Sequence, residues 1–152
     1  MKMSLLVAAA VAACLPVLAS AQFAKPEDAI KYRQSAMYLQ NNHMGRLFAM
    51  INGQVPFDAK VAAENIEIVA MLNSRAQFAA FIEGSDKGNT RAKPEIWTEK
   101  DKFAARVAKS QEDVLKLAAA GKTGNLDQIK AAAGAVGESC KACHDAYQKP
   151  AQ

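Results

Sequence analysis

The sequence predicts an all-α domain that folds as an antiparallel up-down-up-down four-helix bundle. The chain is rich in alanine and in long unbranched side chains, which favour helix. Its apolar residues recur at helical intervals, and no stretch shows the sustained alternation of a half-buried strand. Four helices of about twenty residues, joined mostly by short connections, pack most simply as neighbours of alternating direction.

The first helix is expected to run from Pro26 to near Gly53. Proline is favoured at the first helical position, and Glu27 and Asp28 suit the positive end of the helix dipole. The residues of its apolar stripe are Ile30, Met37, Met44, Leu47, Phe48 and Ile51.

Asp58 is the expected N-cap of the second helix. This helix is expected to fray through Phe78 and Phe81, and a glycine-rich, charged link then covers residues 83–94. The residues expected on its buried face are Val61, Ile68, Val69 and Leu72.

Two sequence patterns indicate where the third and fourth helices begin. Thr98 and Asp101 resemble a capping box for the third, which ends near Gly121, and Asn125 with Gln128 resembles one for the fourth. The apolar face of the third helix comprises Phe103, Val107, Val114 and Leu117. That of the fourth comprises Leu126, Ile129, Ala133, Val136, Cys140, Cys143 and Tyr147.

Residues 1–21 have the three parts of a bacterial secretory signal peptide. Lys2 is a short basic start, an apolar run follows, and small residues end the segment. We expect its removal, which leaves residues 22–152 as one domain in the periplasm. An alternative makes Cys14 the lipidated first residue of a lipoprotein, but the apolar core before it is short. No later stretch is long and apolar enough to span a membrane.

Cys140, Cys143 and His144 form a Cys-x-x-Cys-His pattern, which is typical of covalent haem attachment. These positions share one face of a helix, so two thioether bonds can hold the porphyrin edge while the imidazole reaches the iron. We predict one haem c with His144 as axial iron ligand. A redox or structural cysteine pair is the alternative. A structural zinc site is less favoured still, because it requires four ligands and only His43 remains to add to these three residues.

The antiparallel bundle also predicts which residues surround this motif. The end of the fourth helix lies level with the start of the first, the end of the second and the start of the third. Cofactor partners should therefore come from residues 30–40, 76–82 and 91–103. In the first helix only Met37 is level with the haem, because Met44 lies about 10 Å further along at ~1.5 Å per residue.

The other histidine and methionines are expected to have no role at the haem. His43 is displaced along the bundle like Met44 and is expected at the surface. Met50 and Met71 should lie far from the motif and serve as packing residues.

Arg33 and Gln34 interrupt the apolar stripe one turn before Met37, where polar groups need a partner. Haem propionates would provide that partner, and the alternative is that both side chains reach into solvent. Phe78 and Phe81 have the right level and bulk to wall the pocket, but they fit an ordinary core equally well.

Charge and motif content exclude two classes of function. The 19 basic and 15 acidic residues are interleaved, so a mixed solvated surface is favoured over nucleic-acid binding. Beyond the haem motif there is no second constellation of acid, base or nucleophile, and enzyme activity is not expected.

These features resemble the class II c-type cytochromes, and within them cytochrome c-prime. The resemblance covers nearly the whole mature chain. It rests on the haem motif close to the C-terminus, on Lys25 to Asp28 leading into Lys31 to Gln34, and on Lys93 to Trp97 before the third helix.

The resemblance implies a four-helix bundle, often a homodimer, with a high-spin and usually five-coordinate iron. Such proteins bind nitric oxide and carbon monoxide and exclude oxygen. The resemblance further implies that Met37 and Phe81 form the distal pocket. The residues that it places at the haem periphery are Arg33, Gln34, Lys93 and Glu95.

Two positions qualify the resemblance. Some low-spin class II cytochromes place an axial methionine where Met37 stands, which would make this protein a six-coordinate electron carrier with no gas site. The pair Arg33 and Gln34 is typical of the cytochrome c-prime branch and favours the open iron. Gln148 stands where relatives commonly carry a basic residue, so the proximal role of that charge does not carry over. The sequence identifies no redox partner.

Overall fold

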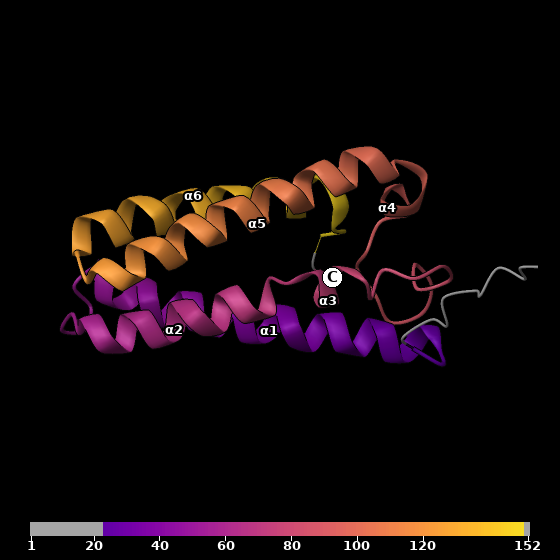
Figure 1. The fold of residues 1–152 in the computed structure, drawn as a ribbon. Coiled ribbons are helices and arrows are strands. Elements are labelled where there is room, and N and C mark those ends of the chain that lie inside the picture. Colours follow the sequence, from indigo (N-terminus) through magenta and orange to yellow (C-terminus); the bar gives the residue numbers. More distant parts are fainter. Residues whose placement is uncertain (1–22, 151–152) are drawn as a thin grey trace, which may run out of the picture.

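The computed structural model describes residues 23–150, which form the predicted helical bundle (Figure 1). Its long helices are α1 (Pro26–Ile51), α2 (Ala59–Leu72), α5 (Lys100–Thr123) and α6 (Leu126–Tyr147). Two short helices, α3 (Arg75–Phe78) and α4 (Glu95–Thr98), lie between α2 and α5. The predicted signal peptide, residues 1–21, lies outside the described residues and stays a prediction. Within residues 23–150 no helix has the length and hydropathy needed to cross a membrane.

The four long helices alternate in direction, with α1 packed on α2, α2 on α5 and α5 on α6. Figure 1 shows the α1–α2 pair and the α5–α6 pair close together at the end that holds the α5–α6 turn. The pairs diverge toward the other end, where α4 and the C-terminus lie. The start of α1, α3, the start of α5 and the end of α6 therefore surround one open end of the bundle.

The hydrophobic core fills the closed part of the bundle. Leu47 of α1, Ile66 and Val69 of α2, Leu117 of α5 and Ile129 of α6 are each at most 1% exposed. Complete burial of such a side chain stabilises a fold by about 1.5–3 kcal/mol. This packing holds the four helices together and leaves the open end free to surround a ligand.

Two of the predicted helix starts are confirmed by side-chain caps. The Asp58 carboxylate accepts hydrogen bonds from the backbone N–H of Lys60 at 2.9 Å and of Val61 at 3.0 Å. The Asn125 side chain accepts one from the N–H of Gln128 at 3.0 Å. Each cap satisfies backbone donors that the first turn of a helix leaves without a partner.

Replacing Asp58 by alanine should lower the free energy of unfolding by about 1 kcal/mol, because two backbone N–H groups of α2 lose their acceptor. Urea unfolding followed by circular dichroism measures this change. Asp58→Asn keeps an acceptor oxygen and is the matched control, expected within about 0.5 kcal/mol of the wild type. Equal losses in the two variants would contradict capping.

The capping box predicted at Thr98 is wrong. Thr98 is the last residue of α4, and Glu99 precedes α5 without a side-chain cap. The reason is that the segment after Pro94 forms a separate helical turn, so Thr98 is already helical and lacks the extended backbone of an N-cap.

The face predicted for α2 is only partly right. Val69 is buried, but Val61 is 42% exposed, and Ile68 and Leu72 are half-buried. Because α2 is apolar on more than one side, its periodicity does not select the packed face. The close packing of α2 on α5 selects this face. Ile66 lies so near to Gly121 of α5 that a Cβ added to Gly121 would be 3.0 Å from Ile66 Cδ1. The buried residues of α2 are Ala62, Asn65, Ile66 and Val69.

Two single-residue predictions also need correction. Met71, predicted to pack in the core, is 66% exposed, because α2 turns its other face to α5. His43, predicted at the surface, is half-buried, and its Nδ1 lies 2.8 Å from Oδ1 of the buried Asn65. A polar partner inside the bundle accounts for the burial of this imidazole.

Candidate functional site

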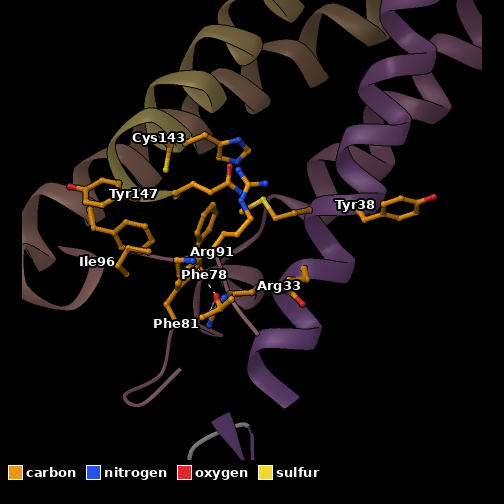
Figure 2. Close-up of a pocket in the computed structure, with 15 residues that line it drawn as sticks. Arg33, Tyr38, Phe78, Phe81, Arg91, Ile96, Cys143 and Tyr147 are labelled. Atoms are coloured by element: carbon orange, nitrogen blue, oxygen red, sulfur yellow. Dashed lines mark hydrogen bonds between the residues drawn. The ribbon is translucent and has the colours of Figure 1, made fainter. Parts of the chain in front are cut away.

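A cavity of about 350 Å³ lies in the open end of the bundle. Apart from Thr90, every lining residue outside α6 and the segment after it falls in the three ranges predicted from the bundle topology. Figure 2 shows side chains converging from α1, the segment around α3, the link before α5, and α6, whereas Tyr38 points away from the cluster. The lining residues are Arg33, Gln34, Met37, Tyr38, Phe78, Phe81, Thr90, Arg91, Ala92, Ile96, Phe103, Cys143, His144, Tyr147 and Gln148.

The cysteine-histidine motif lies where the core meets this cavity. Cys143 and His144 line the cavity from the last turns of α6. Cys140, one turn earlier, is partly buried and packs against the hydrophobic core. The three residues predicted to hold the haem therefore follow one another along the wall that α6 provides.

The surroundings of the two thiols disfavour a redox-active cysteine pair. Burial raises the pKa of Cys140, and the carboxylate of Asp113 raises it further. Burial also raises the pKa of Cys143, with a smaller contribution from Cys140. Reactive cysteine pairs depend on a lowered thiol pKa, because the thiolate is the nucleophile. This chemistry is more consistent with structural attachment than with disulfide exchange.

His144 is kept in the form that binds metals. His144 lines the cavity and is exposed to solvent. Crowding by the surrounding protein lowers the pKa of His144, the positive charge of Arg91 lowers it further, and Asp145 opposes both. The neutral imidazole that coordinates iron therefore predominates at neutral pH.

Arg33 is buried, with 4% of its surface exposed. Its guanidinium donates hydrogen bonds to Ala80 O at 3.1 Å, Ser85 Oγ at 2.7 Å, Ser85 O at 2.5 Å and Thr90 Oγ1 at 2.8 Å. It also lies 4.8 Å from the centroid of the Phe81 ring. Burial lowers the pKa of Arg33 to about 10. The alternative in which Arg33 reaches into solvent is therefore wrong, and its contact with the haem periphery stays a prediction.

Gln34 and Met37 complete the wall that α1 provides. Gln34 is exposed, and its Nε2 donates to Asn89 O at 2.9 Å. Met37 is half-buried and is the one methionine among the cavity-lining residues described. Met44 packs against the core and Met50 is 5% exposed within it. The rise of the helix thus separates the methionines as predicted.

Aromatic rings form a continuous wall of the cavity. The Phe81 ring lies 6.5 Å from that of Phe78 and 5.1 Å from that of Phe103, between ring centroids. Phe103 in turn meets Tyr147 edge-on at 5.3 Å. Phe78 and Phe81 therefore belong to the pocket as well as to the packing around it. From the sequence, Phe103 and Tyr147 are expected on the apolar faces of their helices, and their level in the bundle is the signal that places them at the cavity.

Lys93 and Glu95 lie outside the cavity lining. Lys93 Nζ donates to Asp145 O at 3.0 Å and to Ala146 O at 3.1 Å, while its backbone N–H donates to Tyr147 O at 2.9 Å. Lys93 thereby satisfies terminal carbonyls of α6, which have no partner within the helix. Glu95 is exposed at the start of α4. Their contact with the haem periphery stays a prediction.

The cavity has the chemistry that haem c requires. Its volume falls in the range of about 300–1,000 Å³ that is usual for bound cofactors. Its aromatic and aliphatic walls match the faces of a porphyrin. Cys143 and the neutral imidazole of His144 line one wall, and Cys140 lies one turn away. The residues present therefore suit a covalently held haem.

Comparisons with known proteins identify the family of this chain. The family model described as Cytochrome C' matches residues 28–148. The cytochrome c' of Rubrivivax gelatinosus is 54% identical over 129 residues, covering 84% of this chain and 99% of that relative. Its crystal structure has a TM-score of 0.81 to this fold, at 53% identity, and covers 84% of this chain and 100% of that chain.

Structures of a second relative contain gases. A nitric oxide complex of a cytochrome c prime variant from Alcaligenes xylosoxidans has a TM-score of 0.80, at 45% identity, and covers 86% of this chain and 100% of that chain. A carbon monoxide-bound variant of the same protein has a TM-score of 0.79, at 46% identity, and covers 85% and 100%. Since the family model spans most of the chain and these relatives match along their full length, the chain belongs to the cytochrome c' family, whose members carry haem c.

Proposed function

We propose that this protein is a periplasmic haem protein that binds nitric oxide or carbon monoxide at an open iron face. Its role is to buffer or detoxify nitric oxide, with one-electron transfer as a second role. Cys140 and Cys143 form the thioether bonds, and His144 is the axial ligand. Haem c, when bound, supplies the iron to which the gas attaches. The redox partner is not identified, and no enzyme activity is proposed.

The observation that carries this proposal is that three apolar side chains form part of the cavity wall away from α6. Met37, Phe78 and Phe81 line it and present no hydrogen-bond donor. The guanidinium of Arg33, which also borders the cavity, already has four acceptors in the protein. Bound oxygen gains much from a distal donor, whereas nitric oxide and carbon monoxide depend on one less. The gas complexes of the Alcaligenes relative support the same reading.

A low-spin electron carrier is the second candidate, because Met37 lines the cavity with a sulfur that can bind iron. Absorption spectra of the ferric and ferrous protein, with and without nitric oxide, separate the two. We expect a high-spin ferric spectrum and a new spectrum on adding nitric oxide. A low-spin ferric spectrum with a methionine-to-iron charge-transfer band, unchanged by the gas, would establish the electron carrier instead.

Replacing Met37 by alanine should raise the affinity for carbon monoxide about tenfold, because a side chain that covers the iron face is removed; tenfold corresponds to about 1.4 kcal/mol. Gas titration followed by absorption measures this affinity. Met71→Ala is the matched control, since Met71 is 66% exposed on α2. An affinity that is unchanged in Met37→Ala would show that Met37 is not the lid.

We also propose that the protein is a homodimer. Large apolar side chains on α1 and α2 face solvent in the single chain, including Leu39 at 44%, Val61 at 42% and Met71 at 66% exposure. Burial of such side chains favours association. Sedimentation equilibrium of the haem-loaded protein tests this, and a monomer at all concentrations would contradict it.

A further inference from the structure

We infer that Arg91 supplies the positive charge beside His144 that sets the balance between ferric and ferrous iron. This inference rests on the haem attachment proposed above and does not depend on gas binding. Arg91 lies at the end of the glycine-rich link and is the first residue of the 91–103 range predicted to supply cofactor partners, but the sequence gives it no individual role. In the structure it lines the same cavity as Cys143, His144 and Gln148.

Hydrogen bonds hold Arg91 against the segment that follows His144. Its Nε donates to Lys149 O at 2.8 Å, and the Lys149 N–H donates to Arg91 O at 2.7 Å. Next to this pair, Ala92 and Gln148 form an isolated antiparallel bridge. The Gln148 N–H donates to His144 O at 2.9 Å, which ties the bridge to the last turn of α6. The position of Arg91 relative to His144 is therefore determined by the backbone.

The guanidinium of Arg91 remains available to the cavity. Figure 2 shows Arg91 within the cluster of side chains that surrounds it. Only Nε of Arg91 has a protein partner among the described residues, whereas the guanidinium of Arg33 makes four hydrogen bonds to the 80–90 segment. Lys93, the nearest other cation in sequence, directs its ammonium to carbonyls of α6. Among the cations of this link, Arg91 is the one that lines the cavity together with His144.

A fixed positive charge at this place opposes the extra positive charge of ferric iron. Arginine keeps its charge at all relevant pH values, so the effect does not depend on protonation of Arg91. Arg91 and His144 line the same cavity, and the bridge between Ala92 and Gln148 links their two segments. Gln148, which follows α6 at the bridge, is neutral and contributes no charge. Arg91 therefore favours the ferrous state.

The test is a spectroelectrochemical titration of the haem-loaded protein without gas. At the wild-type midpoint potential, Arg91→Gln should lower the ratio of ferrous to ferric protein about three- to tenfold, as expected for loss of one partly screened charge. Arg91→Lys keeps the charge and should stay within about twofold of the wild type. Arg46→Gln removes an exposed arginine of α1 that does not line the cavity and is the matched control, with a shift below about twofold.

A second variant tests the place of the charge. Gln148→Arg added to Arg91→Gln returns a cation to the other side of the bridge and should recover most of the lost ferrous fraction. An unchanged ratio in Arg91→Gln overturns the inference, as does a loss in Arg91→Lys equal to that in Arg91→Gln, which would assign the effect to hydrogen-bond geometry. Wild-type protein without covalent haem would instead refute the proposed function.

Discussion

Replacing both Cys140 and Cys143 by alanine should abolish covalent haem attachment completely, whereas His144→Ala should leave the haem attached and change its spectrum. Thioether bonds survive denaturation, but an iron-imidazole bond does not. Haem staining of a denaturing gel, beside absorption spectra of the native protein, separates these outcomes. Each single cysteine variant keeps one thioether and should retain a stained band.

Lys141→Ala is the matched control for these variants. Lys141 lies between the two cysteines, is exposed, and pairs with Asp145 at 2.5 Å on the surface of α6. Exposed pairs of this kind contribute about 0–1 kcal/mol, so this variant should attach haem like the wild type. Staining that persists after loss of both cysteines would refute the proposed attachment site.

Arg33→Ala should lower the free energy of unfolding by about 2–4 kcal/mol, because buried acceptors at Ala80 and Ser85 lose a charged donor and a gap opens beside Phe81. Urea unfolding followed by circular dichroism measures this change. Arg46→Ala truncates an exposed arginine on the same helix and should change stability by at most about 0.5 kcal/mol.

Lysine at position 33 tests why an arginine is needed there. Arg33→Lys keeps the charge but lacks the planar fork that reaches Ala80, Ser85 and Thr90 together. We expect a loss between those of the alanine variant and the wild type. A loss below about 1 kcal/mol in Arg33→Ala would show that the 80–90 segment keeps its position without this side chain.

The position of the cavity was predictable because it follows from helix direction alone. Once four helices alternate, the end of the last lies beside fixed stretches of the others, and Met37 is selected over Met44 by the rise per residue. The structure brings Met37, Phe78 and Phe81 together with Cys143 and His144 as this argument requires. No knowledge of side-chain contacts was needed for that result.

Other expectations failed where the local sequence pattern was compatible with two arrangements. The apolar residues of α2 lie on more than one side, so the choice of Ala62 and Ile66 over Val61 depended on the approach of Gly121. At Thr98 the local capping pattern did not form a cap, because a separate helical turn begins after Pro94 and includes Thr98. A contact with a residue far away in the chain therefore selected the buried face of α2. An added helical turn removed the cap expected at Thr98.

The sequence by itself determined the helical class, the Asp58 and Asn125 caps, and the motif of Cys140, Cys143 and His144, because these depend on residues close together in the chain. The tertiary structure alone decided the contacts of Arg33 and Arg91. Arg33 meets acceptors in the 80–90 segment, and Arg91 meets the chain after His144. These hydrogen bonds join residues about 50 or more positions apart, which no local pattern encodes.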